Sequence, residues 1–287
     1  MMLGGIFPDL LNILESFVKP ERDKLGDNPD GRRRRQYWWR WGRDTPTLYR
    51  TTSGLPRIMA RSLTSAHFST FALLPPNWIY DQTLLVFAFN SLAPLSVLSS
   101  RVHEAWVRFF GATFKDDSRY NLADCFNNFP FPLAFAGSPE MEEAAQAYCQ
   151  HRATMMVARN EGLTKTYNRF HKSTEKSADI VKLRSHHAEM DAAVLRAYGW
   201  DDLASSAKAE FVELPTDPGK KPKHRLFWPN EVQDEVLKRL LALNAERAEQ
   251  EKRSGLAPTA VVDDVEDPDS DPEANDEDDE EDDGEQE

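Results

Sequence analysis

The last 25 residues of the chain have a composition that no hydrophobic core can use. Residues 263–287 contain 17 acidic residues and no basic one. A segment with so few apolar groups cannot offset the entropy lost on ordering, so we expect residues 254–287 to form a disordered acidic tail. Without those 17, the other 31 acidic residues face 35 basic ones, and the formal charge changes from −13 to +4. The part that can fold is therefore mildly basic, and at roughly 250 residues it can form one or two domains.

Composition also argues against several classes of protein. The two cysteines, Cys125 and Cys149, are too few for a disulfide framework or a cysteine-based zinc site, and they fit a reducing cytoplasm. The N-terminus lacks the basic leader of a signal peptide. The longest apolar stretch, residues 84–89, is far shorter than the ~20 residues that a membrane helix requires. We therefore expect a soluble cytoplasmic protein.

The first half of the chain mixes helix and strand patterns. Apolar residues recur at helical spacing over residues 7–25, where Lys19-Pro20 interrupts the pattern, and a turn signal follows at 28–31. Residues 95–109 predict an amphipathic helix that ends near Gly111. Between them lie short runs rich in β-forming residues, with a turn at Leu74-Pro75-Pro76-Asn77. The predicted strands are residues 57–60, 67–73 and 83–89.

After Gly137 the pattern becomes helical. Ser138-Pro139-Glu140 is typical of a helix start, and further helices are predicted over 177–198 and after Pro229. Residues 162–171 between them indicate a structured loop. Prolines at 130 and 132 close the first domain. We therefore predict an α+β fold: a mixed sheet-and-helix domain over residues 1–136, an all-α C-terminal domain over 137–253, and the disordered tail over 254–287.

The densest positive charge lies in a cluster of arginines and aromatic residues at 32–43. Four consecutive arginines precede Tyr37, Trp38, Trp39 and Trp41, a combination that can hold phosphates while the rings stack on bases. The alternative is that the arginines form a solvated loop and the tryptophans anchor a core. We favour the core for the tryptophans, and nucleic acid for the arginines, because so dense a run has no obvious packing purpose.

Two other segments carry polar groups suited to reading bases. Arg101 and His103 share a predicted helix with Trp106, although a lone histidine on such a helix is more often structural than catalytic. Asn121, with the pair Asn127-Asn128, offers amides that can form paired hydrogen bonds with adenine edges. Equally, the asparagines could cap turns while Phe129 and Phe131 anchor an extended segment.

The sequence lacks the patterns of several enzymes. It has no glycine-rich cofactor loop after a strand, no P-loop and no Asn-Pro-Pro-Tyr motif. Nuclease signatures and His/Cys zinc spacings are absent as well. The residues alone thus favour a DNA- or RNA-binding module without an active site of its own.

Several segments together resemble a known family. They look like the C-terminal half of MmeI-like (type IIG and IIL) adenine-specific DNA methyltransferases of restriction-modification and phage-defence systems. The resemblance covers roughly residues 7–250 in the family's order. The segments that carry it are Val18 to Asp23, Arg101 to Trp106, Cys125 to Pro132, Gly162 to Phe170, Leu183 to Asp191, Ala197 to Asp202 and the helix after Trp228-Pro229.

The resemblance implies a target recognition domain followed by helices that help to clasp double-stranded DNA. The family's cofactor loop, catalytic motif and any nuclease domain lie upstream, so we expect no cofactor in this chain. S-adenosylmethionine is expected on a separate, upstream-encoded methyltransferase or nuclease chain. The expected DNA contacts are Arg32, Arg33, Arg34, Arg35, Arg40, Arg43, Arg61, Arg101, His103, Arg119, Asn121, Asn127 and Asn128. The alternatives are an independent enzyme, a non-catalytic protein-interaction module, and a non-functional remnant of a split methyltransferase gene.

Overall fold

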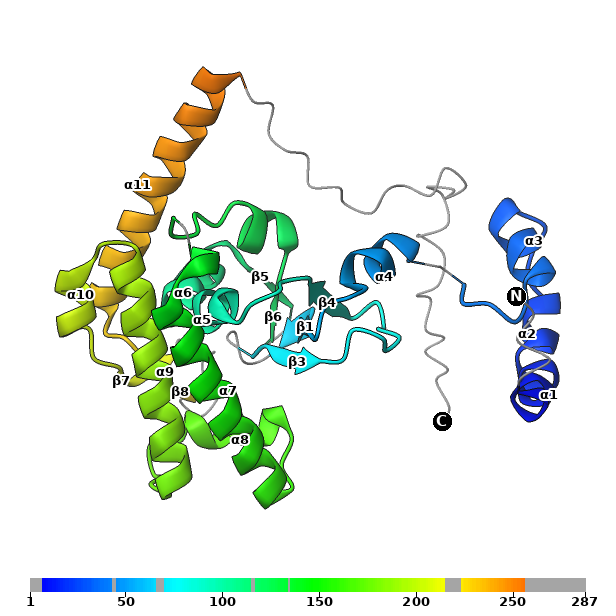
Figure 1. Cartoon of the computed structure of the whole chain (residues 1–287), viewed down its shortest axis with the longest axis horizontal. Helices are drawn as coiled ribbons and strands as arrows, with labels where there is room; N and C mark the ends of the chain where they lie inside the picture. Colours follow the sequence, from blue (N-terminus) through cyan, green and yellow to red (C-terminus); the bar gives the residue numbers. More distant parts are fainter. Residues whose placement is uncertain are drawn as a thin grey trace, which may run out of the picture. The chain divides into compact units, whose positions relative to one another are not determined.

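The computed structural model describes residues 7–42, 45–65, 70–114, 117–133, 135–214 and 223–255, with only the backbone for 112–114, 117–119, 214 and 223. The chain divides into two compact units, which are described separately. The first comprises residues 1–48 and 260–287, and the second comprises residues 49–259. Figure 1 shows the elements of both. The tail predicted over 254–287 lies, from residue 256 onward, outside the described residues.

The described part of the first unit is helical. It contains α1 (Pro8–Phe17), α2 (Lys19–Asp23) and α3 (Pro29–Gln36), each with a proline in its first two positions, where the missing N–H costs nothing. The predicted helix over 7–25 is therefore two helices. The predicted turn at 28–31 is a helix start, because Asn28 accepts a hydrogen bond from the Gly31 N–H at 2.6 Å and caps α3. Helix α4 (Pro46–Thr52) follows.

The second unit contains a three-stranded antiparallel sheet in the order β3-β1-β4. Its strands are β1 (Ile58–Ser62), β3 (Ala72–Leu74) and β4 (Leu84–Phe87), in register through Ile58 with Leu74 and Met59 with Phe87. The strands predicted at 57–60 and 83–89 are confirmed as β1, which is one residue longer, and β4, which is shorter; of the strand predicted at 67–73, residues 67–69 lie outside the described residues, and β3 begins at Ala72. A second sheet has the order β2-β6-β5 and comprises β2 (Thr64–Ser65), β5 (Ala112–Phe114) and β6 (Asp117–Arg119).

The helix predicted over 95–109 is two helices, α5 (Ala93–Ser99) and α6 (Arg101–Phe110). The chain breaks at Ser100, whose backbone is extended and whose hydroxyl accepts a hydrogen bond from the His103 N–H at 3.3 Å. The hydroxyl also donates to the Val97 carbonyl at 2.7 Å, so one side chain ends the first helix and caps the second. A π-helical turn, η2 (Leu122–Asn127), and a short 3-10 turn, η3 (Phe135–Gly137), follow.

The helices predicted after Gly137 are confirmed as α7 (Pro139–Arg159), α9 (Ala178–Ala197) and α11 (Asn230–Ser254). The structure adds α8 (Leu163–Phe170), where a loop was expected, and α10 (Asp201–Ser206). The region is not all-α, because β7 (Glu210–Leu214) and β8 (Lys223–Phe227) form an antiparallel hairpin. Each strand has only five residues, too few for its sequence pattern to predict the hairpin. Leu226 and Phe227 of β8 are buried, so packing against the rest of the unit stabilises the pairing.

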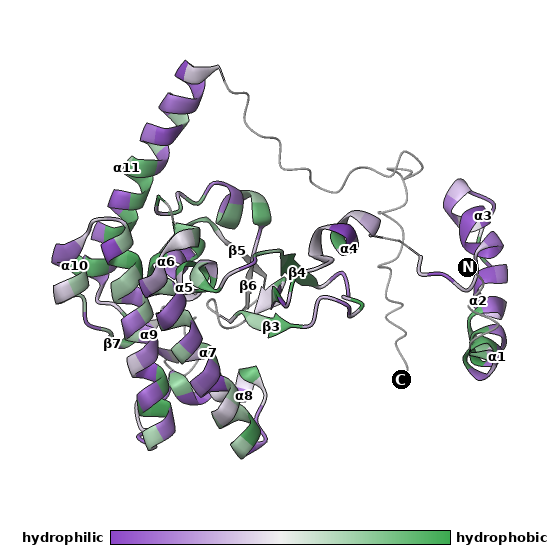
Figure 2. Ribbon diagram, viewed as in Figure 1, coloured by the Kyte–Doolittle hydropathy of each residue, from purple (hydrophilic) through white to green (hydrophobic). Residues whose placement is uncertain are grey.

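Two hydrophobic clusters form the core of the second unit. One joins the sheet residues Met59, Phe71 and Phe87 to Tyr148 of α7 and Leu183 of α9. The other joins Trp106 of α6 to residues of α7, α9 and α11, among them Met141, Val194 and Leu240. Both draw on residues before and after position 136, so the boundary predicted there does not separate two cores. The predicted α+β class is confirmed. Figure 2 shows that strand β4 is hydrophobic and that helix α3 is hydrophilic.

Candidate nucleic-acid interface

His103 is buried in the second unit and faces other parts of the protein. Its Nδ1 lies 2.9 Å from the Leu98 carbonyl, and its Nε2 lies 3.1 Å from both the Tyr120 hydroxyl and the Cys125 carbonyl. Burial lowers the pKa of the ring from 6.5 to about 4, although the two carbonyls act in the opposite direction. The imidazole is therefore neutral at pH 7 and joins α6 to η2. We predicted a DNA contact for His103, and the structure places its ring inside the fold.

Arg101 is likewise buried. Its guanidinium forms an ion pair with the Asp191 carboxylate, which also accepts a hydrogen bond from the Arg101 backbone N–H at 2.8 Å. Burial raises the pKa of Asp191, but the charges of Arg101 and His187, together with the hydrogen bonds from both residues, outweigh burial and lower the pKa. Beside this pair, the buried Glu104 carboxylate forms ion pairs with Arg225 at 2.5 Å and with Arg108 at 3.0 Å, both measured from Nε to Oε1. Arg101, for which we predicted a DNA contact, therefore joins α6 to α9 inside the fold.

Arg61 lies on β1, the central strand of its sheet, and is also buried. Its guanidinium carbon is 4.2 Å from the centre of the Tyr120 ring and 5.4 Å from that of Phe71. Burial lowers its pKa to about 10, so it remains charged at pH 7 and interacts with the faces of two aromatic rings. Arg61, also a predicted DNA contact, is thus placed inside the fold. Its position in sequence gave no sign of this, because both rings come from other segments.

The asparagines lie on or beside the π-helical turn η2. Asn121 caps the turn, accepting from the Ala123 N–H at 3.0 Å and donating to Asp124 at 2.9 Å, which is the turn-capping alternative. The turn itself is held by the Trp106 indole N–H, which donates to the Asp124 carbonyl at 2.9 Å. Asn127 is partly exposed and Asn128 is exposed. The pair thus presents amides to solvent from a turn that is anchored on α6.

The four consecutive arginines form half of α3 and have partners within the protein. Arg33 donates to the Gly42 carbonyl at 2.6 Å, Arg34 pairs with Asp30 at 2.7 Å, and Arg35 pairs with Asp27 at 2.7 Å. Arg32 and Arg35 also donate to backbone carbonyls within residues 25–27. The run therefore does have a packing purpose, contrary to our expectation: it fastens the neighbouring loops to the helix. Arg32 remains largely exposed, and the other three are about one-third exposed.

The aromatic residues after α3 are exposed instead of forming a core. Trp39 is 40% exposed and Trp41 is 68% exposed, and within residues 7–42 only Gly31 is buried. Our preference for a core role is therefore wrong for these two tryptophans. The Arg40 guanidinium lies 5.1 Å from the Tyr37 ring centre, a cation–π distance. A small hollow of about 90 Å³ is lined by Arg33, Arg34, Tyr37, Arg40, Trp41 and Gly42.

Two other predicted contacts are not placed as side chains. Arg43 lies outside the described residues. Arg119 lies in β6, of which only the backbone is described. The predicted residues that reach solvent are therefore Arg32 to Arg35 and Arg40 in the first unit, and Asn121, Asn127 and Asn128 in the second.

Sequence reasoning missed one exposed feature, the connection between β3 and β4 at residues 75–83. Trp78 is 55% exposed and Ile79 is 61% exposed. The turn at 74–77 was predicted, but the two large apolar residues that follow it were not singled out. Their adjacency to a Pro-Pro turn, outside any strand, is the signal that could have identified them.

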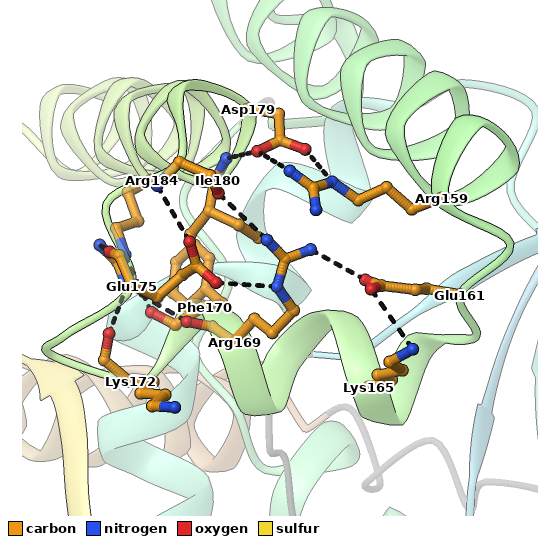
Figure 3. A network of polar contacts seen from close by, with 11 residues as sticks. Arg159, Glu161, Lys165, Arg169, Phe170, Lys172, Glu175, Asp179, Ile180 and Arg184 are labelled. Carbon is orange, nitrogen blue, oxygen red and sulfur yellow. Dashed lines mark hydrogen bonds and ion pairs between the residues drawn. The ribbon is translucent and has the colours of Figure 1, made fainter.

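A network of ion pairs fixes the corner between α7, α8 and α9 (Figure 3). Arg169 contacts Glu161 at 3.1 Å and Glu175 at 2.9 Å, and the hydrogen bond from Arg169 lowers the pKa of Glu175 to about 2. Arg184 donates to the Phe170 carbonyl at 2.9 Å and to the Glu175 carbonyl at 2.8 Å, so it caps the end of α8. The arginines of this corner are thus occupied within the fold.

Nothing in the described ranges suggests metal chemistry or a membrane span. No group of three or more His, Cys, Asp or Glu side chains in these ranges is arranged to hold a metal ion. No helix among the described residues is long and apolar enough to cross a membrane.

The exposed polar and aromatic groups lie in both units: arginines and aromatic rings in and after α3 in the first, and amides on turns beside the small sheet in the second. Residues 39–133 match the sequence model described as "MmeI, target recognition domain". The resemblance predicted from the motifs is thereby confirmed, and residues 39–133 are similar to a target recognition domain of the MmeI type.

Two comparisons with whole proteins extend this result. The chain is 31% identical over 105 residues to DNA methyltransferase A of Bacillus subtilis (strain 168), which is 36% of this chain and 11% of that protein. The structure is similar to that of the type IIL restriction-modification enzyme MmeI in complex with DNA, with a TM-score of 0.57 and 18% identity. That match covers 84% of this chain and 26% of the MmeI chain. The shared fold therefore extends well beyond residues 39–133, and the chain spans only a small part of either relative.

Proposed function

We propose that this chain is the DNA sequence-recognition portion of an adenine-specific DNA methyltransferase of the restriction-modification type. The observation that carries the proposal is the match of residues 39–133 to the MmeI target recognition domain. The fold likeness to MmeI, which was solved with DNA, supports double-stranded DNA as the partner. The described geometry fits a binding role, because the groups that reach solvent are hydrogen-bonding amides, guanidinium groups and aromatic rings.

The division of labour within the chain follows from burial. Arg32 and Arg40 contact phosphates from the first unit, where charge gives affinity without reading sequence. Asn127 and Asn128 read base edges, because a side-chain amide can pair with both the N6 and N7 positions of adenine. The buried residues Arg61, Arg101 and His103 act as positioning residues. They hold β1, α6 and η2 in place, so the turn that carries the exposed amides has a fixed position.

The chemical step belongs, in this proposal, to a separate methyltransferase or nuclease polypeptide. That polypeptide binds S-adenosylmethionine, which supplies the methyl group for the exocyclic amine of a flipped adenine. We place the pair in the cytoplasm, in a restriction-modification system that acts in phage defence. The support is the shared fold and the partial span of this chain relative to the two proteins it matches.

The test is a mobility-shift titration of the full chain on duplex DNA, with and without a methyltransferase chain encoded beside it, over a series of salt concentrations. We expect binding that weakens as salt increases, because phosphate contacts release counterions. No binding in either condition at low salt would contradict the proposal. A methyl-transfer assay with adenine- and cytosine-containing sites then tests the adenine specificity.

A second candidate function, docking on a protein partner, is favoured by α1. Phe7, Leu10, Ile13 and Phe17 are all exposed and recur at three- and four-residue steps, so they form one apolar face. Replacing Ile13 and Phe17 with glutamate would abolish association with a partner chain and leave the salt slope of DNA binding unchanged. Replacing Arg32 and Arg40 would lower the salt slope of DNA binding and leave association with the partner chain unchanged, so the two functions are separable.

A further inference from the structure

The connection between β3 and β4 spans the width of the sheet. Both strands are antiparallel to β1 and lie on opposite sides of it, so they run parallel to each other. The chain must therefore cross from the Ile58 end of β1, where β3 ends, to the Ser62 end, where β4 begins. Residues 75–83 make this crossing, and in Figure 1 they form the cyan loop that extends from the sheet away from α7 and α9.

This crossing loop has a defined conformation. It starts with Pro75-Pro76, whose rings fix two φ angles. The Tyr80 hydroxyl donates to the Pro75 carbonyl, which closes the loop on itself. At its far end, Asp81 accepts from the Thr83 N–H at 2.9 Å, and the Thr83 carbonyl accepts from the Leu63 N–H at 2.7 Å. A loop held in this way loses little further entropy when a ligand binds.

The most exposed part of the crossing loop is apolar. Trp78 and Ile79 are adjacent, and more than half of each side chain faces solvent. Exposing the Trp78 and Ile79 side chains to water on a fixed loop does not stabilise the fold, because apolar surface in water has a higher free energy than buried apolar surface. Adjacent exposed apolar side chains of this kind mark an interaction surface.

The rest of the crossing loop points to bases rather than phosphates. It contains no lysine or arginine, and Asp81 is its only charged residue. The exposed polar side chains of the loop are Asn77, Asp81, Gln82 and Thr83, and two of them, Asn77 and Gln82, carry amides. Amides match the hydrogen-bonding edges of bases, and apolar side chains match base faces. The loop also lies within residues 39–133, the segment that matches the target recognition domain.

We propose that Trp78 and Ile79 form a wedge that packs against base faces at one opened step of the recognised duplex, while Asn77 and Gln82 contact the neighbouring base edges. The inference rests on the proposed DNA-recognition function and adds a residue pair that this function did not require. The wedge makes the interaction depend on how easily that base step unstacks, so it selects for deformable sequences as well as for base edges.

The experiment begins with the full chain and a pool of randomised duplexes, from which bound sequences are selected. Failure to enrich any duplex would contradict the proposed function itself. With an enriched duplex in hand, 2-aminopurine is placed at successive positions, because its fluorescence rises when it loses a stacking neighbour. We expect a rise at one step on addition of the wild-type chain.

The decisive variants are Trp78→Ala, Ile79→Ala and the double substitution. We expect the double variant to bind the enriched duplex about 10- to 100-fold more weakly, the range that stacking of aromatic side chains on bases produces. The fluorescence rise should disappear, and the slope of affinity against salt should not change, because no phosphate contact is lost. Val157→Ala is the matched control, since Val157 is 82% exposed on α7, and it should bind as the wild type does.

Three outcomes would overturn the wedge without affecting the proposed function. One is unchanged affinity of the double variant for the enriched duplex. Another is weaker binding by the double variant when the wild type itself produces no fluorescence rise at any step. Trp78 and Ile79 would then contact a groove of a duplex whose bases stay stacked. The third is a fall of several degrees in the melting temperature of the double variant, which would show that the two side chains pack against the protein or a partner chain.

Discussion

At the scale of single residues, burial decides which charged groups can meet a ligand. Arg101 and Arg40 are the same residue type, yet one is enclosed with Asp191 and the other lies over an exposed ring. A guanidinium in the interior is stabilised only by its fixed partner, and removing it leaves a buried carboxylate without compensation. The sequence gives the type and spacing of residues but not their burial, which is why it did not show that Arg61, Arg101 and His103 lie inside the fold.

Arg101→Ala tests this distinction. We expect the free energy of unfolding to fall by about 3–5 kcal/mol, because Asp191 would remain charged and buried. The comparison is Arg196→Ala, which breaks an exposed ion pair with Glu140 and should cost at most about 1 kcal/mol. Urea denaturation of both variants is the measurement. A loss of DNA affinity in Arg101→Ala without any loss of stability would restore the direct-contact interpretation.

His103 should make stability depend on pH in the acidic range. Its pKa is about 4 in the folded chain and near 6.5 when exposed. Between these values the unfolded chain binds a proton that the folded chain does not, so this contribution is fully present above pH 6.5 and is lost as the pH falls towards 4. The full difference is roughly 2–4 kcal/mol. Unfolding free energies at pH 7 and 4.5 for wild type and His103→Gln check it: the variant should show a weaker dependence, and equal dependence would contradict it.

At the scale of elements, local patterns located most helices and strands but not their ends or their partners. The break at Ser100 was hidden because apolar spacing continues across it, and only the hydroxyl's two hydrogen bonds reveal the cap. Helix α8 was taken for a loop because its eight residues are largely polar and its end is completed by Arg184 from another helix. The pairing of β7 with β8 depends on packing from distant segments. The exposed amide pair could be proposed from sequence, whereas its support by Trp106 could not.

In and after α3, arginines that hold neighbouring loops can be distinguished from an exposed arginine, Arg40, that the proposed function assigns to a phosphate. Arg35 holds residues 25–27, whereas Arg40 lies beyond the helix and is exposed. Arg40→Gln should lower the slope of log affinity against log salt by about one, with no change in melting temperature. Arg35→Gln should lower the melting temperature of the first unit, since it removes the bond to Asp27. A salt slope unaffected by Arg40→Gln would remove it from the phosphate contacts.

At the scale of the whole molecule, the important boundary lies near residue 48 and not near residue 136. The helices after Gly137 complete the core under the sheet, since Tyr148 and Leu183 share a cluster with Met59. Ion pairs reinforce this union, because Glu104 of α6 meets Arg225 of β8, 121 positions along the chain. The sheet therefore depends on the C-terminal helices for its stability, and the fold likeness to MmeI likewise covers 84% of this chain.

Dividing the chain tests that dependence. A fragment of residues 45–259, which keeps α4 whole, should unfold in a single transition, because both core clusters lie within it and are joined across position 136. Fragments 1–136 and 137–259 should each lack cooperative unfolding, since each would expose half of both clusters to water. Calorimetry and near-ultraviolet circular dichroism on the three fragments measure this. If residues 1–136 melted cooperatively alone, the recognition sheet would be an independent domain, and the ion pairs from α6 to α9 and β8 would serve to orient two bodies instead of building one core.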